Sequence, residues 1–243
     1  MILSLDKPAG WTPLEALDDL RSRTPALADE AMVYAGRLDP MAEGLLLVLT
    51  GEDRFALDLH LAHDKEYVAT VLFGVGSDTH DALGRLHPGS PPDAVACAAA
   101  VADLVGAHEL PLPVWSAYRV QGRPLWSWAR DSRLSEITVP RRTMTVSALT
   151  LGEVRPSTLA ELLPDIQNRI ERVRGDFRQT AALADWVRLA ERDPRLVLAR
   201  ATLSVASGTY VRALAHDLGA RLGCGALLLC LRRTRVGPFT LHE

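Results

Sequence analysis

The spacing of hydrophobic and polar residues along the chain predicts several strands with helices between them. Apolar residues run without a break from 44 to 50, and apolar and polar residues alternate over 66–73, and both patterns are typical of strands. Further strands are expected at 1–5, 114–121, 143–151 and 196–206. Helices are expected at 13–23, 93–105, 125–130 and 209–222. Because strands and helices do not alternate strictly, the pattern favours an α+β fold with a mostly antiparallel mixed central sheet flanked by helices.

Several elements carry their own start and stop signals. Thr12 is followed by Pro13 and, three residues on, by Glu15, which is the pattern of a capping box at a helix start. Gly223 follows the last predicted helix and is expected to end it. The glycine-rich segment 74–84 reads as a polar loop. Residues 156–194 read as two amphipathic helices separated near 174–176.

Composition excludes several classes of protein. The chain has 243 residues, of which 48% are hydrophobic and 23% charged, which is typical of a globular domain rather than a disordered chain. No apolar run approaches the roughly 18 residues that a membrane helix needs. The three cysteines show no CxxC spacing, so we expect a reducing, cytoplasmic location.

The net charge of −3 hides an uneven distribution. Residues 1–60 carry 5 basic and 11 acidic side chains, whereas 114–142 carry six arginines against two acids. Residues 201–243 carry five arginines against two acids. A basic face could therefore form from two distant segments, or these charges could lie on ordinary solvated helix faces.

Asp39 is the first candidate for chemistry. It lies in Gly36-Arg-Leu-Asp39, directly before Pro40 and the apolar run that begins at 44. A carboxylate on a loop that is braced by a core strand is well placed to act as a nucleophile or general base. The alternative is that Asp39 only starts a turn before Pro40.

Two arginine-containing stretches are the other candidates. Arg212 follows a turn at 207–208 and could pair with a carboxylate through two parallel hydrogen bonds, or lie on the surface of its helix. Leu231 could form the floor of a pocket, and Arg232 and Arg233 after it could bind phosphates. The alternative is that this segment is a charged edge strand. Small groups of His and Asp lack the spacing of zinc sites, so no metal is expected.

These stretches, in this order, resemble the TruB family, the tRNA pseudouridine synthases that act on the T-loop uridine at position 55. Further matching motifs stand at 6–12, 64–67, 74–84, 114–117 and 121–130, while 156–194 has no counterpart. The resemblance implies a pseudouridine-synthase fold in one catalytic domain over 1–243. It also implies a helical insertion at 156–194 and a thumb-like segment at about 119–142.

The resemblance also implies roles for single residues and no cofactor. Asp39 would be the catalytic carboxylate that attacks the nucleotide at its sugar, and Arg212 the arginine that pairs with it. Tyr67 would stack on the flipped base and help to remove the C5 proton. The expected substrate-binding residues are Tyr34, Tyr210, Leu231, Arg232, Arg233, Arg119 and Arg130. The partner would be RNA, namely the tRNA T-loop, bound by a monomer.

Two departures from the family pattern stand out. Tyr34 occupies the position of a histidine that fills the place of the flipped base. The chain stops at Glu243, and we expect it to lack the small C-terminal RNA-binding domain (PUA) of bacterial members. Three alternatives stay open: a synthase acting on ribosomal or messenger RNA, an RNA-binding or tRNA-folding chaperone with weak catalysis, and a small-molecule lyase or hydrolase that uses Asp39.

Overall fold

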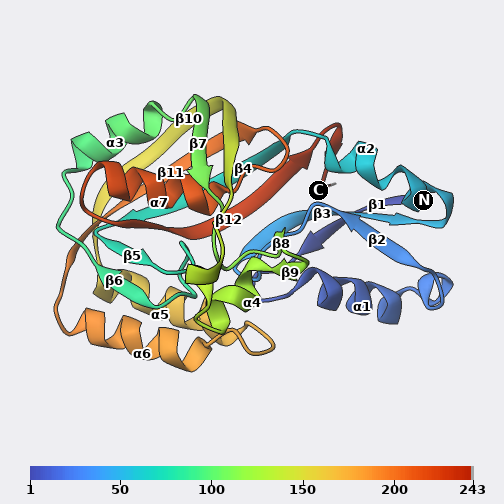
Figure 1. The fold of residues 1–243 in the computed structure, drawn as a ribbon, viewed down its shortest axis with the longest axis horizontal. Helices are drawn as coiled ribbons and strands as arrows, with labels where there is room; N and C mark the ends of the chain where they lie inside the picture. The colour runs from blue at the N-terminus through green and yellow to red at the C-terminus, as the bar shows by residue number, and fades with distance from the viewer. Residues whose placement is uncertain (242–243) are drawn as a thin grey trace.

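A nine-stranded sheet runs through the whole molecule (Figure 1). The structure is a computed structural model and describes residues 1–241. The main strands lie in the order β1 (Ile2–Lys7), β3 (Ala42–Thr50), β12 (Ala226–Val236), β4 (Lys65–Phe73), β11 (Arg195–Val205), β10 (Arg141–Thr158) and β7 (Gly106–Pro111). Two short strands extend it, β2 (Met32–Ala35) beside β3 and β13 (Phe239–Thr240) beside β12. Only β3 and β12 pair in parallel among these strands, so the predicted mostly antiparallel mixed sheet is confirmed.

Helices cover both faces of the sheet (Figure 1). Helices α3 (Ala94–Ala102) and α7 (Val211–Arg221) pack on one face, and α5 (Leu159–Glu171) and α6 (Gln179–Ala190) on the other. Helices α1 (Pro13–Arg23) and α2 (Leu57–Leu61) lie at the end formed by β1, β2 and β3. The remaining elements are η1 (Pro25–Leu27), η2 (Gly51–Ala56), η3 (Leu134–Glu136), α4 (Leu125–Arg130) and the hairpins β5 (Val75–Ser77)–β6 (Leu86–Pro88) and β8 (Arg119–Val120)–β9 (Arg123–Pro124).

The two faces of the sheet hold separate hydrophobic cores. Along β4, Tyr67, Val71 and Phe73 enter the core under α3 and α7, while Leu72 enters the core under α5 and α6. Trp186 of α6 is fully buried in that second core. This alternation follows from the two-residue period of a strand, which sends successive side chains to opposite faces.

Most predicted elements are present. Helix α1 has the bounds predicted for it and the full capping box, in which the backbone N–H of Glu15 donates to Thr12 Oγ1 and that of Thr12 to Glu15 Oε2. Helix α4 spans the predicted 125–130, and α5 and α6 are the two helices expected within 156–194. Whether those helices form an insertion, and whether 119–142 moves as a thumb, stay predictions.

Two local predictions were wrong, and one of the open alternatives is excluded. Segment 114–121 is not a strand apart from Arg119 and Val120, because its carbonyls at Ser116 and Tyr118 accept hydrogen bonds from the first N–H groups of α4. The loop predicted at 74–84 contains β5 and is largely buried. The segment around Leu231 is not an edge strand, since β12 lies between β3 and β4.

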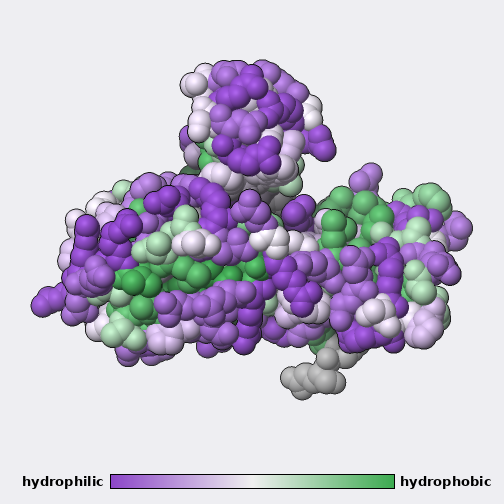
Figure 2. All heavy atoms as spheres, turned by 90° about the horizontal axis from the view of Figure 1, so that it is seen from below, coloured by the Kyte–Doolittle hydropathy of each residue, from purple (hydrophilic) through white to green (hydrophobic). Residues whose placement is uncertain are grey.

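The outer surface is mainly hydrophilic on the side that carries α1, α5 and α6. Apolar side chains gather there in two separate areas, with polar side chains between them (Figure 2). Within residues 1–241, each helix is too short or too polar to cross a membrane.

Gly44 gives a direct test of how tightly β3 and β12 approach each other. Its φ is +97°, and a Cβ there would overlap the backbone of Arg233, whereas Gly51 has φ +56° and open space around it. Gly51→Ala should cost only the strain of a left-handed residue, about 1–2 kcal/mol. Gly44→Ala should cost a further 1–3 kcal/mol or so because of overpacking. Urea unfolding of both variants measures this, and equal losses would contradict the close approach.

Candidate active site

The loop that carries Asp39 connects β2 to β3 and is held from three directions. The Asp39 carbonyl accepts from Ala42 N–H at 3.0 Å, and the Pro40 carbonyl accepts from Gly10 N–H at 2.8 Å. Arg233 of β12 is buried and donates to the carbonyls of Gly36 and Leu45, at 2.9 and 2.7 Å. The loop is therefore fixed by its backbone, which leaves the Asp39 side chain 37% exposed and open to a ligand.

Arg212 lies in the first turn of α7 and is almost completely buried. Its Nε donates to Asp39 Oδ2 at 2.8 Å. Its Nη1 donates to the carbonyl of Thr79 at 2.9 Å and its Nη2 to that of Trp115 at 3.3 Å. The predicted pairing of Arg212 with a carboxylate is present, but only one nitrogen serves Asp39, because the other two hold backbone carbonyls. A single guanidinium thus joins four segments of the chain.

The turn before α7 sets the position of Arg212. Ser207 donates to the Leu61 carbonyl at 2.6 Å, and Thr209 Oγ1 accepts from Thr145 N–H at 3.2 Å. Tyr210 stands next and is mostly buried, and this burial raises the pKa of its phenol. The positive charge of Arg212 opposes that rise in the pKa of Tyr210, and the negative charge of Asp39 adds to it. Both charges of the ion pair therefore act on Tyr210.

A second carboxyl group, Asp81, lies under the same arginine. It is buried, and its Oδ1 accepts from Thr79 Oγ1 at 2.5 Å and from Leu83 N–H at 3.0 Å. Burial raises the pKa of Asp81, while the nearby Arg212 works against that rise. The loop between β5 and β6 therefore contributes both a carbonyl acceptor and a buried acid to the surroundings of Arg212.

Both lysines of the chain lie buried near this site, and the sequence interpretation missed them. Lys7 donates to the Trp11 carbonyl at 2.6 Å, and burial lowers its pKa to about 8 although Asp39 and Glu43 oppose this. Lys65 donates to the Leu61 carbonyl at 2.6 Å, and burial, followed by the charge of Arg233, lowers its pKa to about 8. The signal was available, because only 2 of the 27 basic residues are lysine.

Five of the other predicted site residues lie on β4, on β12 or directly before α7. Tyr67 on β4 and Leu231 on β12 belong to the face of the sheet that carries α7, as does Tyr210. Arg232 pairs with Asp6 at 2.8 Å on the surface. Arg233, which the sequence assigns to phosphate binding, is buried, and its guanidinium donates to two backbone carbonyls. Its contact with a substrate stays a prediction.

Three predicted residues lie in other parts of the molecule. Tyr34 is on β2 and packs against the cluster under α1. Arg119 is in the β8–β9 hairpin and donates to the Gly122 carbonyl at 2.6 Å. Arg130 ends α4, exposed, with its guanidinium 5.1 Å from the centre of the Trp126 ring. Their contacts with a substrate stay predictions.

Solved structures show the same fold. One match is a chain in the crystal structure of a Cbf5-Nop10-Gar1 complex, with a TM-score of 0.60, 22% identity, and coverage of 100% of this chain and 50% of that one. Another is in the structure of an H/ACA RNP bound to a substrate RNA containing 2′-deoxyuridine, with a TM-score of 0.58, 21% identity, and coverage of 100% and 49%. At this identity the likeness concerns the fold alone.

Sequence comparison places the chain in a family. The model of the TruB family pseudouridylate synthase N-terminal domain matches residues 26–177, and the model of the tRNA pseudouridylate synthase B C-terminal domain matches 212–243. The chain therefore belongs to the TruB family of pseudouridylate synthases. It is 35% identical to tRNA pseudouridine synthase B of Thermobifida fusca (strain YX) and 36% identical to that of Burkholderia mallei (strain NCTC 10247). These alignments cover the whole chain and 71% and 66% of the relatives, so the chain spans about two thirds of their length.

Lys7 provides a test of the electrostatics of the site. Its pKa is about 8 in the folded protein, against an ordinary value of 10.5. Between these values the unfolded chain binds a proton that the folded protein does not, so the free energy of unfolding gains a contribution from Lys7 as the pH rises from about 8 to 10.5. Below pH 8 both states are protonated and the contribution is constant.

Urea unfolding at pH 7.5, 8.5, 9.5 and 10.5 measures this effect against Lys7→Met. The stability of the wild type relative to the variant should grow across that range. Arg23→Met removes an exposed charge that does not titrate there, and its difference from the wild type should stay flat. A Lys7→Met difference that is also flat would contradict the lowered pKa.

Proposed function

We propose that this chain isomerises uridine to pseudouridine in RNA, with the tRNA T-loop as its target. The observation that carries this proposal is the ion pair between Asp39 and the buried Arg212, at 2.8 Å, in a chain of the TruB family. Asp39 is accessible from solvent, whereas its partner is not. A substrate can therefore reach the carboxylate without displacing the arginine that orients it.

The reaction exchanges one glycosidic bond for another. The Asp39 carboxylate attacks C1′ of the target uridine, the N1–C1′ bond breaks, and the bond electrons leave with the uracil ring. The ring turns, C5 attacks C1′, and the Asp39–C1′ bond breaks. The proton on C5 then leaves and N1, which has lost its bond to the sugar, takes up a proton, which restores the uracil ring. The product has the same atoms as the substrate apart from this exchange of one proton with solvent, so the reaction requires no oxidant, reductant or nucleotide.

The surroundings of Asp39 fit these steps. The target base must leave its stack, which costs a few kcal/mol, and an apolar pocket must hold it while it is detached. Tyr67, Tyr210 and Leu231 come from the face of the sheet that carries Arg212, and we assign the flipped base to the space beside them. Arg212 fixes the orientation of the Asp39 carboxylate, because its Nε donates to Oδ2 at 2.8 Å.

The proposal also concerns the contacts with RNA, the oligomeric state of the protein and its location. The six arginines of 114–142 lie in the β8–β9 hairpin, on or after α4, and at the start of β10. We assign them to phosphate contacts, which would make binding of RNA strongly salt-dependent. We also propose that the chain acts as a monomer in the cytoplasm. Gel filtration coupled to light scattering tests the first of these two statements.

Asp39→Asn should abolish isomerisation, because an amide is no nucleophile. The measurement is tritium release from a T-arm RNA labelled at uridine C5, where the wild type should release one tritium for each uridine converted and the variant none above background. If neither protein releases tritium and both retain the RNA on a filter, the chaperone alternative is favoured. Mapping of pseudouridine in cells that lack the protein separates tRNA from ribosomal or messenger RNA as the target.

Arg212→Lys should lower the rate of isomerisation although it keeps the charge. One ammonium nitrogen cannot serve Asp39, Thr79 and Trp115 together, since a lysine has no planar fork. Loss of one charged hydrogen bond predicts a roughly 10- to 100-fold slower single turnover. Arg221→Lys is the matched control, because it lies on the same helix in an exposed pair with Asp217. Wild-type turnover by Arg212→Lys would refute the pairing.

A further inference from the structure

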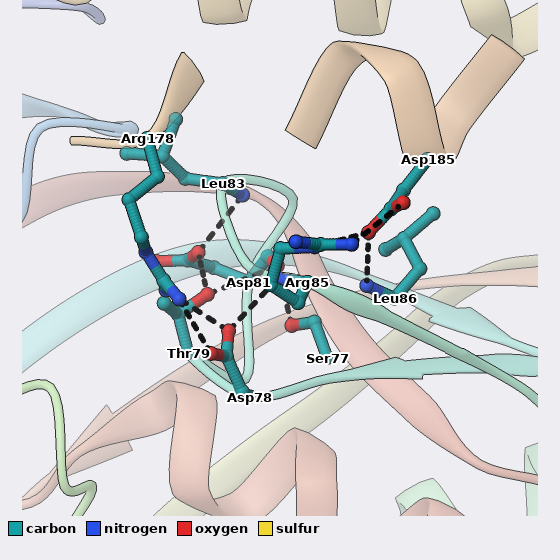
Figure 3. A network of polar contacts seen from close by, with 9 residues as sticks. All are labelled: Ser77, Asp78, Thr79, Asp81, Leu83, Arg85, Leu86, Arg178 and Asp185. Carbon is teal, nitrogen blue, oxygen red and sulfur yellow. Dashed lines mark hydrogen bonds and ion pairs between the residues drawn. The ribbon is translucent and has the colours of Figure 1, made fainter. Parts of the chain in front are cut away.

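Helix α6 and the residue before it are attached to the loop between β5 and β6 by two salt bridges, which Figure 3 shows, and by a hydrogen bond from Trp186. Arg178, which directly precedes α6, donates to both carboxylate oxygens of Asp78 at 2.7 and 3.1 Å. Asp185 of α6 accepts from Arg85 at 2.6 and 3.2 Å. Trp186 Nε1 donates to the Ala82 carbonyl at 2.8 Å. Two bidentate salt bridges and one buried hydrogen bond therefore hold one short loop. The same loop contains Thr79, whose carbonyl accepts from Arg212.

Arg178 differs from the other two contacts because it touches a second segment. Its guanidinium carbon lies 3.8 Å from the centre of the Trp115 ring, which is the distance of a close cation–π stack. Trp115 supplies the second carbonyl acceptor of Arg212, and Asp78 is the neighbour of the residue that supplies the first. One side chain thus bridges the two segments whose carbonyls orient Arg212.

The backbone at Arg178 is unusual for a residue with a side chain. Its φ of 64° and ψ of 28° lie in the left-handed region, directly before α6. Residues other than glycine occupy this region rarely, and persist there when surrounding contacts hold them. Residues 178–211 also lie between the two stretches that match the family models.

We propose that Arg178 is a positioning residue for the catalytic ion pair, acting through Asp78 and Trp115 on the acceptors of Arg212. This inference rests on the proposed function of Asp39 and Arg212. The two acceptors come from segments that are separate in the chain, and Arg178 contacts both segments. When Arg178 holds them in register, the guanidinium of Arg212 has one orientation, and its Nε faces Asp39. Helices α5 and α6 then serve to brace the active site.

The first test compares Arg178→Ala with Arg85→Ala in single-turnover and steady-state kinetics on a T-arm RNA. Both variants remove one salt bridge between α6 and the loop, but only the first also removes the stack on Trp115. Small displacements of a reacting group cost on the order of 100-fold in rate. Arg178→Ala should lose rate on that scale in kcat with an unchanged KM, while Arg85→Ala stays close to the wild type. Equal losses by the two variants would overturn the proposal.

A double-mutant cycle asks whether Arg178 acts through Arg212. If it does, Arg178→Ala should cost little in a chain that already carries Arg212→Lys, because the geometry that it protects has been lost. The same fold loss in both backgrounds would mean that Arg178 acts independently, and would contradict the proposal. If Arg178→Ala does not fold, Asp78→Asn weakens the same bridge with little change of shape and takes its place in both tests.

A measurement without substrate separates this inference from the proposed function. The Nε–H of Arg212, assigned in a ¹⁵N NMR spectrum by its loss in Arg212→Lys, should exchange slowly with water in the wild type and in Arg85→Ala. It should exchange faster in Arg178→Ala. If the wild type converts no uridine but this pattern holds, the proposed function fails and the positioning role stands. Unchanged exchange in Arg178→Ala would overturn the positioning role whatever the activity.

Discussion

The constraint on which the structure depends is the need to satisfy a buried guanidinium. Arg212 is 3% exposed, and a charge taken out of water is costly unless it is paired and its donors are bonded. Its three bonded nitrogens require Asp39, Thr79 and Trp115 to meet at one point. The sheet brings the loop after β2, the loop after β5 and the segment after β7 to the start of α7. At the candidate site these four segments meet, and three of them supply the hydrogen-bond acceptors of Arg212, which the fourth carries.

Many of the unevenly distributed charged side chains bind other parts of the same chain. The acidic first sixty residues and the arginine-rich last forty meet in the ion pairs Asp39–Arg212 and Asp6–Arg232. The buried Arg233 and the lysines Lys7 and Lys65 surround the loop of Asp39 and hold backbone carbonyls rather than partners outside the protein. The arginines of the basic segment 114–142 are mostly exposed, and four of them pair with acids near the surface, namely Arg123 and Arg130 with Asp131, Arg133 with Glu136 and Arg141 with Glu109.

The sequence predicted those parts of the fold that depend on local chemistry. The capping box at Thr12, the helix at 125–130 and the pairing of Arg212 with Asp39 could be identified because neighbouring residues or a known motif specify them. The position of β12 inside the sheet, the burial of Arg233 and the role of Trp115 could not, because each depends on residues far away in the chain. Arg178 meets Asp78 across one hundred positions, and no local pattern marks that contact.

The central claim is that Asp39, held by Arg212, lies against the sugar of the target uridine. A structure of the Asp39→Asn variant bound to a T-arm RNA hairpin measures this most directly, because the variant binds without turning the substrate over. We predict that the side chain of residue 39 lies about 3–3.5 Å from C1′ of one flipped-out uridine, as reacting atoms do before attack. An RNA bound on another face, or a uridine still stacked in its loop, would contradict the account.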